Sequence, residues 1–183
     1  LLEKEYFFHK LISILSLNDN NIKKGVLQII GEILKYTKNN KYIELFIQKN
    51  IINILSTIAS ADNIVQKEEQ VLLLKYYVMN TKDIFHKGSI EMIYKTLITL
   101  IQTYANNPIL NVNILTIVSE LVKDETNANE EDYAYYLNII LDVCLNNLKE
   151  GLNTSKLQVS LKTIYHIFKH QKIDLYKVTT NTN

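Results

Sequence analysis

The sequence Phe-Ile-Gln-Lys-Asn-Ile-Ile-Asn-Ile-Leu-Ser at residues 46–56 has two relatives elsewhere in the same chain. Residues 8–16 read Phe-His-Lys-Leu-Ile-Ser-Ile-Leu-Ser, and residues 85–93 read Phe-His-Lys-Gly-Ser-Ile-Glu-Met-Ile. Aligning Lys10, Asn50 and Gly88 gives spacings of 40 and 38 residues. A period near 40 is typical of stacked helical repeats, none of which can bury its apolar face alone. The repeat therefore predicts an α-solenoid and favours binding over catalysis.

Apolar residues between these segments recur at helical spacing. Ile22, Val26, Ile29, Ile30 and Ile33 form one stripe of a helix, and β-hairpin pairs such as Asn-Gly are missing from the sequence. We predict an all-helical chain in two alternating sets. The first set covers roughly 5–17, 50–60, 89–105 and 131–149, and the second covers roughly 21–37, 65–79, 109–123 and 154–170. Polar connectors supply Asn, Asp or Ser as N-caps, and Pro108 opens its helix.

A short additional helix is expected before the first-set helix of each middle repeat, at 41–49 and 81–87. These segments end at Asn50 and Gly88, the residue types that most easily adopt a left-handed conformation. We therefore predict a positive φ at or beside both residues, with a sharp turn into the next helix. Leu15 and Leu55 are predicted to occupy equivalent buried positions, as are Phe46 and Phe85.

A short helix, a turn at Gly or Asn and two longer helices make the chain resemble the armadillo family, with HEAT repeats as the close alternative. The turn sequences are Lys49-Asn50-Ile51-Ile52 and Lys87-Gly88-Ser89-Ile90, and the third-helix endings are Ile30-Gly31-Glu32-Ile33 and Val118-Ser119-Glu120-Leu121. The resemblance implies a right-handed α-solenoid of about four repeats. It predicts one armadillo-like domain over residues 1–176 and a disordered tail over 177–183. The chain begins at Leu1, so we expect a fragment of a longer protein.

The family holds extended peptides with an asparagine on the third helix, and this chain has other residues at the matching positions. Glu32 and Glu120 take that place in the first and third repeats, Tyr76 or Tyr77 in the second, and His166 in the fourth. The chain also contains no Trp, so the aromatic slots of importin-like carriers are missing. Carrier function is thus a distant alternative.

Composition restricts the partner. The 20 basic residues are all Lys, and 19 acidic residues nearly balance them. Without Arg the chain has no bidentate forks for phosphate or guanine, which disfavours nucleic-acid recognition. A single cysteine, Cys144, rules out an intramolecular disulfide, favours a reducing, cytoplasmic location and is predicted to be buried. No stretch is apolar enough to predict a transmembrane segment.

The sequence predicts a non-enzymatic scaffold that binds a protein segment along the concave face of the solenoid. The acidic candidates suggest a partner segment containing Lys or Arg. The alternative is a structural subunit permanently buried in a large assembly. No cofactor is expected, and His166 with His170 lacks the third ligand of a metal site. The candidate partner-binding residues on the concave face are Gln28, Glu32, Tyr76, Tyr77, Asn113, Glu120 and His166.

Overall fold

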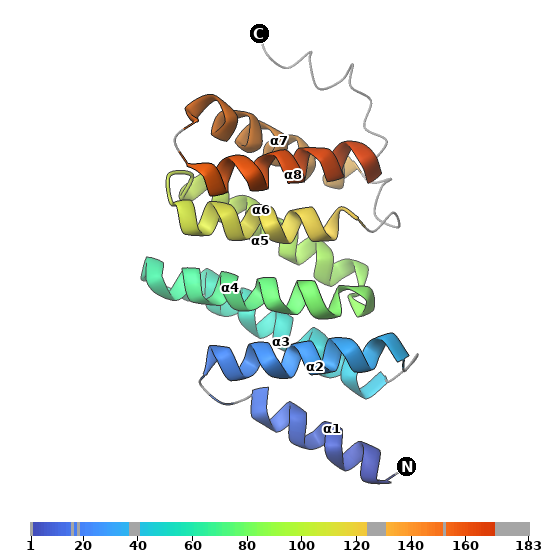
Figure 1. The fold of residues 1–183 in the computed structure, drawn as a ribbon. Helices are drawn as coiled ribbons and strands as arrows, with labels where there is room; N and C mark the ends of the chain where they lie inside the picture. The colour runs from blue at the N-terminus through green and yellow to red at the C-terminus, as the bar shows by residue number, and fades with distance from the viewer. Residues whose placement is uncertain are drawn as a thin grey trace. The chain divides into compact units, whose positions relative to one another are not determined.

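A computed structural model describes residues 2–15, 17, 19–36, 41–123, 131–151 and 153–170 (Figure 1). Within those ranges the regular structure is helical, and no residue there lies in a strand. This confirms the predicted all-α class. None of the helices in the described part of the chain is long and apolar enough to cross a membrane.

The helices alternate as the sequence predicts, with one short 3₁₀ segment. Short connectors join successive helices, and most predicted boundaries agree to within a few residues. In chain order the elements are α1 (Leu2–Leu15), α2 (Asn20–Tyr36), α3 (Lys41–Ser60), α4 (Ile64–Thr81), η1 (Lys82–Ile84), α5 (Lys87–Thr103), α6 (Pro108–Leu121), α7 (Glu131–Glu150) and α8 (Thr154–His170).

The predicted N-caps are present. Asn63 accepts a hydrogen bond from the Gln66 backbone N–H at 2.9 Å, and Asn107 accepts one from Leu110 at 2.9 Å. Pro108 follows Asn107 in the first turn of α6, where its missing N–H costs nothing. Asn153 caps α8 in the same way. These side chains satisfy amides that would otherwise lack partners and so fix where the second-set helices begin.

The turn predicted at Asn50 is wrong. Helix α3 continues from Lys41 through Asn50 to Ser60, and the Asn50 side-chain amide donates back to the Phe46 carbonyl at 2.9 Å. The amide therefore bonds along the helix instead of ending it. The predicted short helix at 41–49 and the helix at 50–60 are one element.

The positive φ predicted at Gly88 is also wrong, although the chain does turn just before this residue, between η1 and α5. Gly88 lies in the first turn of α5 without a left-handed φ, and only Gly151 among the described glycines has a positive φ, at 65°. The chain changes direction through η1 instead. Buried Gln48 of α3 donates to the Ile84 carbonyl at 2.7 Å and accepts a hydrogen bond from Ser89. The turn between η1 and α5 is therefore held by the Gln48 side chain of α3, and not by a glycine in a left-handed conformation.

The chain divides into two compact units. Unit 1 comprises Leu1–Ser89 and unit 2 comprises Ile90–Asn183. In unit 1, α2 lies beside α4, while α3 packs on α4 and α1 packs on α2 (Figure 1). Leu15 and Leu55 are both buried as predicted, whereas Phe46 and Phe85 are only half-buried. Fully buried residues at the centre of this core include Leu27, Ile30, Ile47, Ile51, Ile58, Val71, Leu74 and Val78.

In unit 2, α6 and α7 both pack on α8. Tyr94 of α5 reaches α7, where its ring contacts those of Tyr133 and Tyr136 with centroids 5.1 and 6.0 Å apart. Cys144 of α7 is fully buried, as predicted, and burial raises the pKa of its thiol to about 12 despite a hydrogen bond to Ser160. A thiol held neutral in this way is structural.

Candidate functional site

The seven sequence-predicted site residues fall into three groups. Gln28 and Glu32 are exposed on α2, and Tyr76 is half-exposed on the neighbouring α4. Glu120 and His166 lie partly exposed on α6 and α8 of unit 2. The remaining two, Tyr77 and Asn113, belong to the cores of their units.

The prediction that Tyr77 and Asn113 bind a partner is wrong, because both side chains are buried. Tyr77 is 2% exposed, and burial raises the pKa of its hydroxyl. Adjacent helix residues point about 100° apart, so when Tyr77 faces the core Tyr76 reaches the surface. Asn113 is 8% exposed on α6, between core residues Ile114 and Leu110. Neither side chain is available to a partner.

Helices α2 and α4 approach each other closely at one point, where α2 has a buried glycine. A Cβ atom on Gly31 would lie 2.8 Å from the backbone oxygen of Asn80 and 3.1 Å from its Cβ. Only a residue without a side chain fits at that distance. Gly31 thus sets the separation of the two helices and the shape of the surface beside it.

A pocket of about 170 Å³ lies next to this contact. Its charged lining residues are Glu32 of α2 and Lys82 and Asp83 of η1, so acidic residues outnumber basic ones. The last turn of α4 adds the negative end of its helix dipole. The pocket is therefore suited to a positively charged group. The full set of lining residues is Gly31, Glu32, Met79, Asn80, Thr81, Lys82, Asp83 and Ile84.

Two lysines gather around Tyr76. The ammonium groups of Lys24 on α2 and Lys75 on α4 lie 5.1 and 5.7 Å from the centre of its ring. Both ammonium groups are within cation–π range of the ring, so two positive charges lie close to each other. Burial, and secondarily the charge of Lys24, lowers the pKa of Lys75. This cluster is suited to a negatively charged group.

These features share one surface. Lys24, Gln28 and Glu32 follow each other at four-residue intervals, which places them along one side of α2. Tyr76 and Asn80 have the same spacing on α4, and Asn80 donates a side-chain hydrogen bond to the Tyr76 carbonyl at 2.7 Å. We call the surface made by Lys24, Gln28, Glu32, Tyr76 and Asn80 the α2–α4 face.

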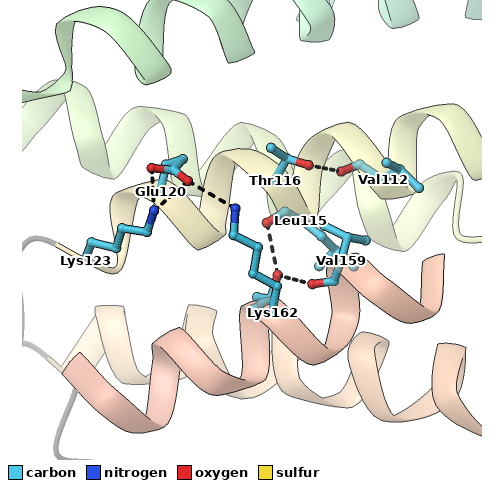
Figure 2. A network of polar contacts seen from close by, with 8 residues as sticks. Val112, Leu115, Thr116, Glu120, Lys123, Val159 and Lys162 are labelled. Atoms are coloured by element: carbon cyan, nitrogen blue, oxygen red, sulfur yellow. Dashed lines mark hydrogen bonds and ion pairs between the residues drawn. The ribbon is translucent and has the colours of Figure 1, made fainter. Parts of the chain in front are cut away.

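Glu120, the predicted counterpart of Glu32, has a different role. Lys123 contacts its two carboxylate oxygens at 2.7 and 2.8 Å, and Lys162 of α8 approaches one of them at 3.5 Å (Figure 2). The Glu120 side chain is only 16% exposed. This carboxylate joins α6 to α8 within unit 2.

His166 lies beside the same charges. Its Nδ1 is buried, with no hydrogen-bond partner among the described residues, and the ring stacks edge-on against Tyr165 at 5.2 Å. Burial first, and then the charges of Lys123 and Lys162, lower the pKa of its imidazole, while Glu120 opposes them. His170 is close by, with ring centroids 5.8 Å apart. Nowhere in the described ranges do three or more His, Cys, Asp or Glu side chains gather as metal ligands.

Two features of the structure were not predicted from the sequence: the lysine cluster around Tyr76 and a buried polar network in unit 2. Asn147 of α7 donates to Asn111 of α6 at 2.9 Å and to Ser160 of α8 at 3.0 Å. All three residues are at most 5% exposed. The sequence carried no signal for the lysine cluster, because Lys24 and Lys75 come from two different helices. For the network there was none either, because it joins residues 36 and 13 positions apart.

No protein-family model, curated protein or solved structure matches this chain.

Proposed function

We propose that this protein is a non-enzymatic scaffold that binds a segment of a partner protein on the second-set helices α2 and α4 of unit 1. The observation that supports this most is the α2–α4 face, where exposed polar side chains, a half-exposed aromatic ring and a pocket adjoin one another. The same proposal takes the helices as repeats of a right-handed α-solenoid of the armadillo or HEAT type. Extended or helical partner segments bind such helix faces.

The size and lining of the pocket favour a side chain over a small-molecule substrate. Its volume of about 170 Å³ is well below the about 300–1,000 Å³ of pockets that enclose drug-sized ligands. Its acidic residues, Glu32 of α2 and Asp83 of η1, outnumber the one basic lining residue, Lys82, and suit a Lys or Arg side chain. The proposed partner therefore carries at least one basic residue. A reducing, cytoplasmic setting is part of the proposal, since the one cysteine is a buried thiol.

A permanent structural subunit is the second candidate, and one observation favours it. Leu161, Tyr165 and Phe168 are 57%, 55% and 39% exposed on α8, and their spacing places them on one side of the helix. Exposed apolar stripes of this kind mark surfaces that other chains cover. In that case the partner would remain bound through purification.

Site-specific photo-cross-linking tests the scaffold proposal. A benzophenone amino acid replaces exposed Gln28 on α2, and a matched chain carries it at exposed Asn53 on α3, in the same unit. Both full chains are expressed in the native cells and irradiated. The proposal predicts distinct adducts from position 28 that position 53 does not give.

Equal adducts from both positions, or adducts from position 53 alone, would contradict the proposal. Size-exclusion chromatography of the untreated chain separates the two candidates. A scaffold with an exchangeable partner elutes mostly alone after dilution, whereas a permanent subunit elutes at constant stoichiometry with its neighbours.

A further inference from the structure

The two ends of the α2–α4 face have opposite charge preferences. At one end Lys24 and Lys75 both lie against the ring of Tyr76. Two ammonium groups that share one ring repel each other, and an anion placed between them removes that repulsion. Tyr76 adds an apolar surface beside the charges, which suits a carboxylate on a short aliphatic stem.

At the other end the pocket presents carboxylates. Glu32 and Asp83 line it together with one basic residue, Lys82, and the C-terminal turn of α4, so the acidic residues are in excess. A basic side chain entering this pocket would meet an excess of acidic residues and the negative end of a helix dipole. Gly31 keeps the pocket in place, because its contact with Asn80 fixes the spacing of α2 and α4.

The distance between the two ends follows from helix geometry. Lys24 and Glu32 are eight residues apart on α2, which at about 1.5 Å per residue is about 12 Å. An extended peptide advances about 3.3 Å per residue, so about 12 Å corresponds to three or four residues. We propose that the α2–α4 face recognises a partner segment in which an acidic and a basic residue lie three or four positions apart in extended conformation.

In this arrangement the acidic residue lies at Lys24 and Lys75, and the basic residue enters the Glu32 pocket. The order of the two charges along α2 then fixes the direction of the bound segment. The inference rests on the proposed scaffold function and specifies its partner. Exposed charge pairs add selectivity and association rate more than affinity, so the preference should weaken as salt rises.

Selection from a displayed library of random 12-residue peptides on the intact chain provides the test. Enriched peptides are synthesised with a fluorophore and titrated by anisotropy against wild type, Lys24→Gln and Glu32→Gln. The matched controls are Lys49→Gln and Asp62→Asn. Both residues are exposed in the same unit, Lys49 on α3 and Asp62 between α3 and α4. Circular dichroism establishes that every variant keeps its helices.

The inference predicts enrichment of an acidic and a basic residue three or four positions apart, in one order. Lys24→Gln should weaken binding about three- to tenfold, and replacing the peptide's acidic residue by Gln should then have little further effect. Glu32→Gln should behave in the same way toward the basic residue. The two control variants should bind as wild type does.

Two results would overturn the inference, and only one of them would also contradict the proposed scaffold function. Selected peptides that cross-link from position 28 but carry no such charge spacing would contradict the inference and leave the scaffold function standing. Peptides that never cross-link from position 28 would contradict both.

Discussion

The α2–α4 junction of unit 1 and the α6–α8 junction of unit 2 join helices of the same predicted set by different means. Gly31 brings α2 against the backbone of α4 at Asn80. Helices α6 and α8 are joined by side chains: Thr163 donates to the Leu115 carbonyl at 3.1 Å, and Lys162 reaches Glu120 (Figure 2). The α2–α4 junction depends on a glycine, which has no side chain, and the α6–α8 junction depends on polar side chains.

This difference decides what the two predicted groove glutamates do. The glycine contact leaves a pocket beside it, with exposed Glu32 in its lining. The polar junction uses Glu120, which lies between Lys123 and Lys162 with its side chain 16% exposed. We therefore propose that, of the two positions aligned in the sequence, Glu32 serves a partner, whereas Glu120 stabilises the fold of unit 2.

The largest expected effect tests whether unit 2 depends on polar side chains. Asn147→Ala would leave the buried amide of Asn111 and the hydroxyl of Ser160 without their shared partner. Each unsatisfied buried group costs about 1–3 kcal/mol, so we expect the free energy of unfolding to fall by about 3 kcal/mol. Urea unfolding measures it, with exposed Asn146→Ala as the control. A loss equal to that of the control would show that the network is not needed.

The next effect tests the glycine junction of unit 1. Gly31→Ala places a Cβ 2.8 Å from the Asn80 oxygen and should destabilise the protein by about 1 kcal/mol or more, although alanine favours helices. Gly25→Ala lies in the same helix with no atom within 4 Å of its new Cβ, and should stabilise by about 0.5–1 kcal/mol. Thermal melts compare the pair. A Gly31→Ala variant as stable as Gly25→Ala, or more stable, would refute the close contact.

A smaller effect concerns pH. The pKa of His166 is lowered in the folded state, by burial and by Lys123 and Lys162, so the folded chain binds fewer protons there than the unfolded chain. Its contribution to stability is complete above the ordinary pKa of about 6.5 and is lost as pH falls through the folded value. The melting temperature of His166→Gln should therefore fall less than that of wild type when the pH is lowered from 7.5 to 5. Exposed His86→Gln is the control, and an equal loss in all three chains would contradict the assignment.

Local patterns in the sequence were sufficient for the helices and their caps. Asn63, Asn107 and Asn153 act within three residues of their own positions, so propensity and spacing predict them. At Asn50 the side chain bonds to the Phe46 carbonyl four residues earlier and the helix continues, whereas near Gly88 a tertiary contact decides the course of the chain. Gln48 holds the chain at Ile84 and Ser89, residues that are 36 and 41 positions away.

The candidate site was predictable only in part for the same reason. Helical spacing predicts that one tyrosine of the pair Tyr76 and Tyr77 is buried, but which one depends on how α4 rotates against its neighbours. The lysines around Tyr76 come from two helices, and the partners of Glu120 include Lys162, 42 residues away. Aligning the repeats shows which residues occupy matching positions, but it does not show which neighbouring side chains neutralise their charges.

Thermal melting of Glu32→Gln and Glu120→Gln side by side tests most directly whether one glutamate serves a partner and the other the fold. Glu120→Gln removes charged contacts to Lys123 and Lys162 at a mostly buried carboxylate, and we expect it to cost about 1–2 kcal/mol. Glu32→Gln alters an exposed carboxylate and should stay within about 0.5 kcal/mol of wild type. Equal losses, or a larger loss for Glu32→Gln, would contradict the account.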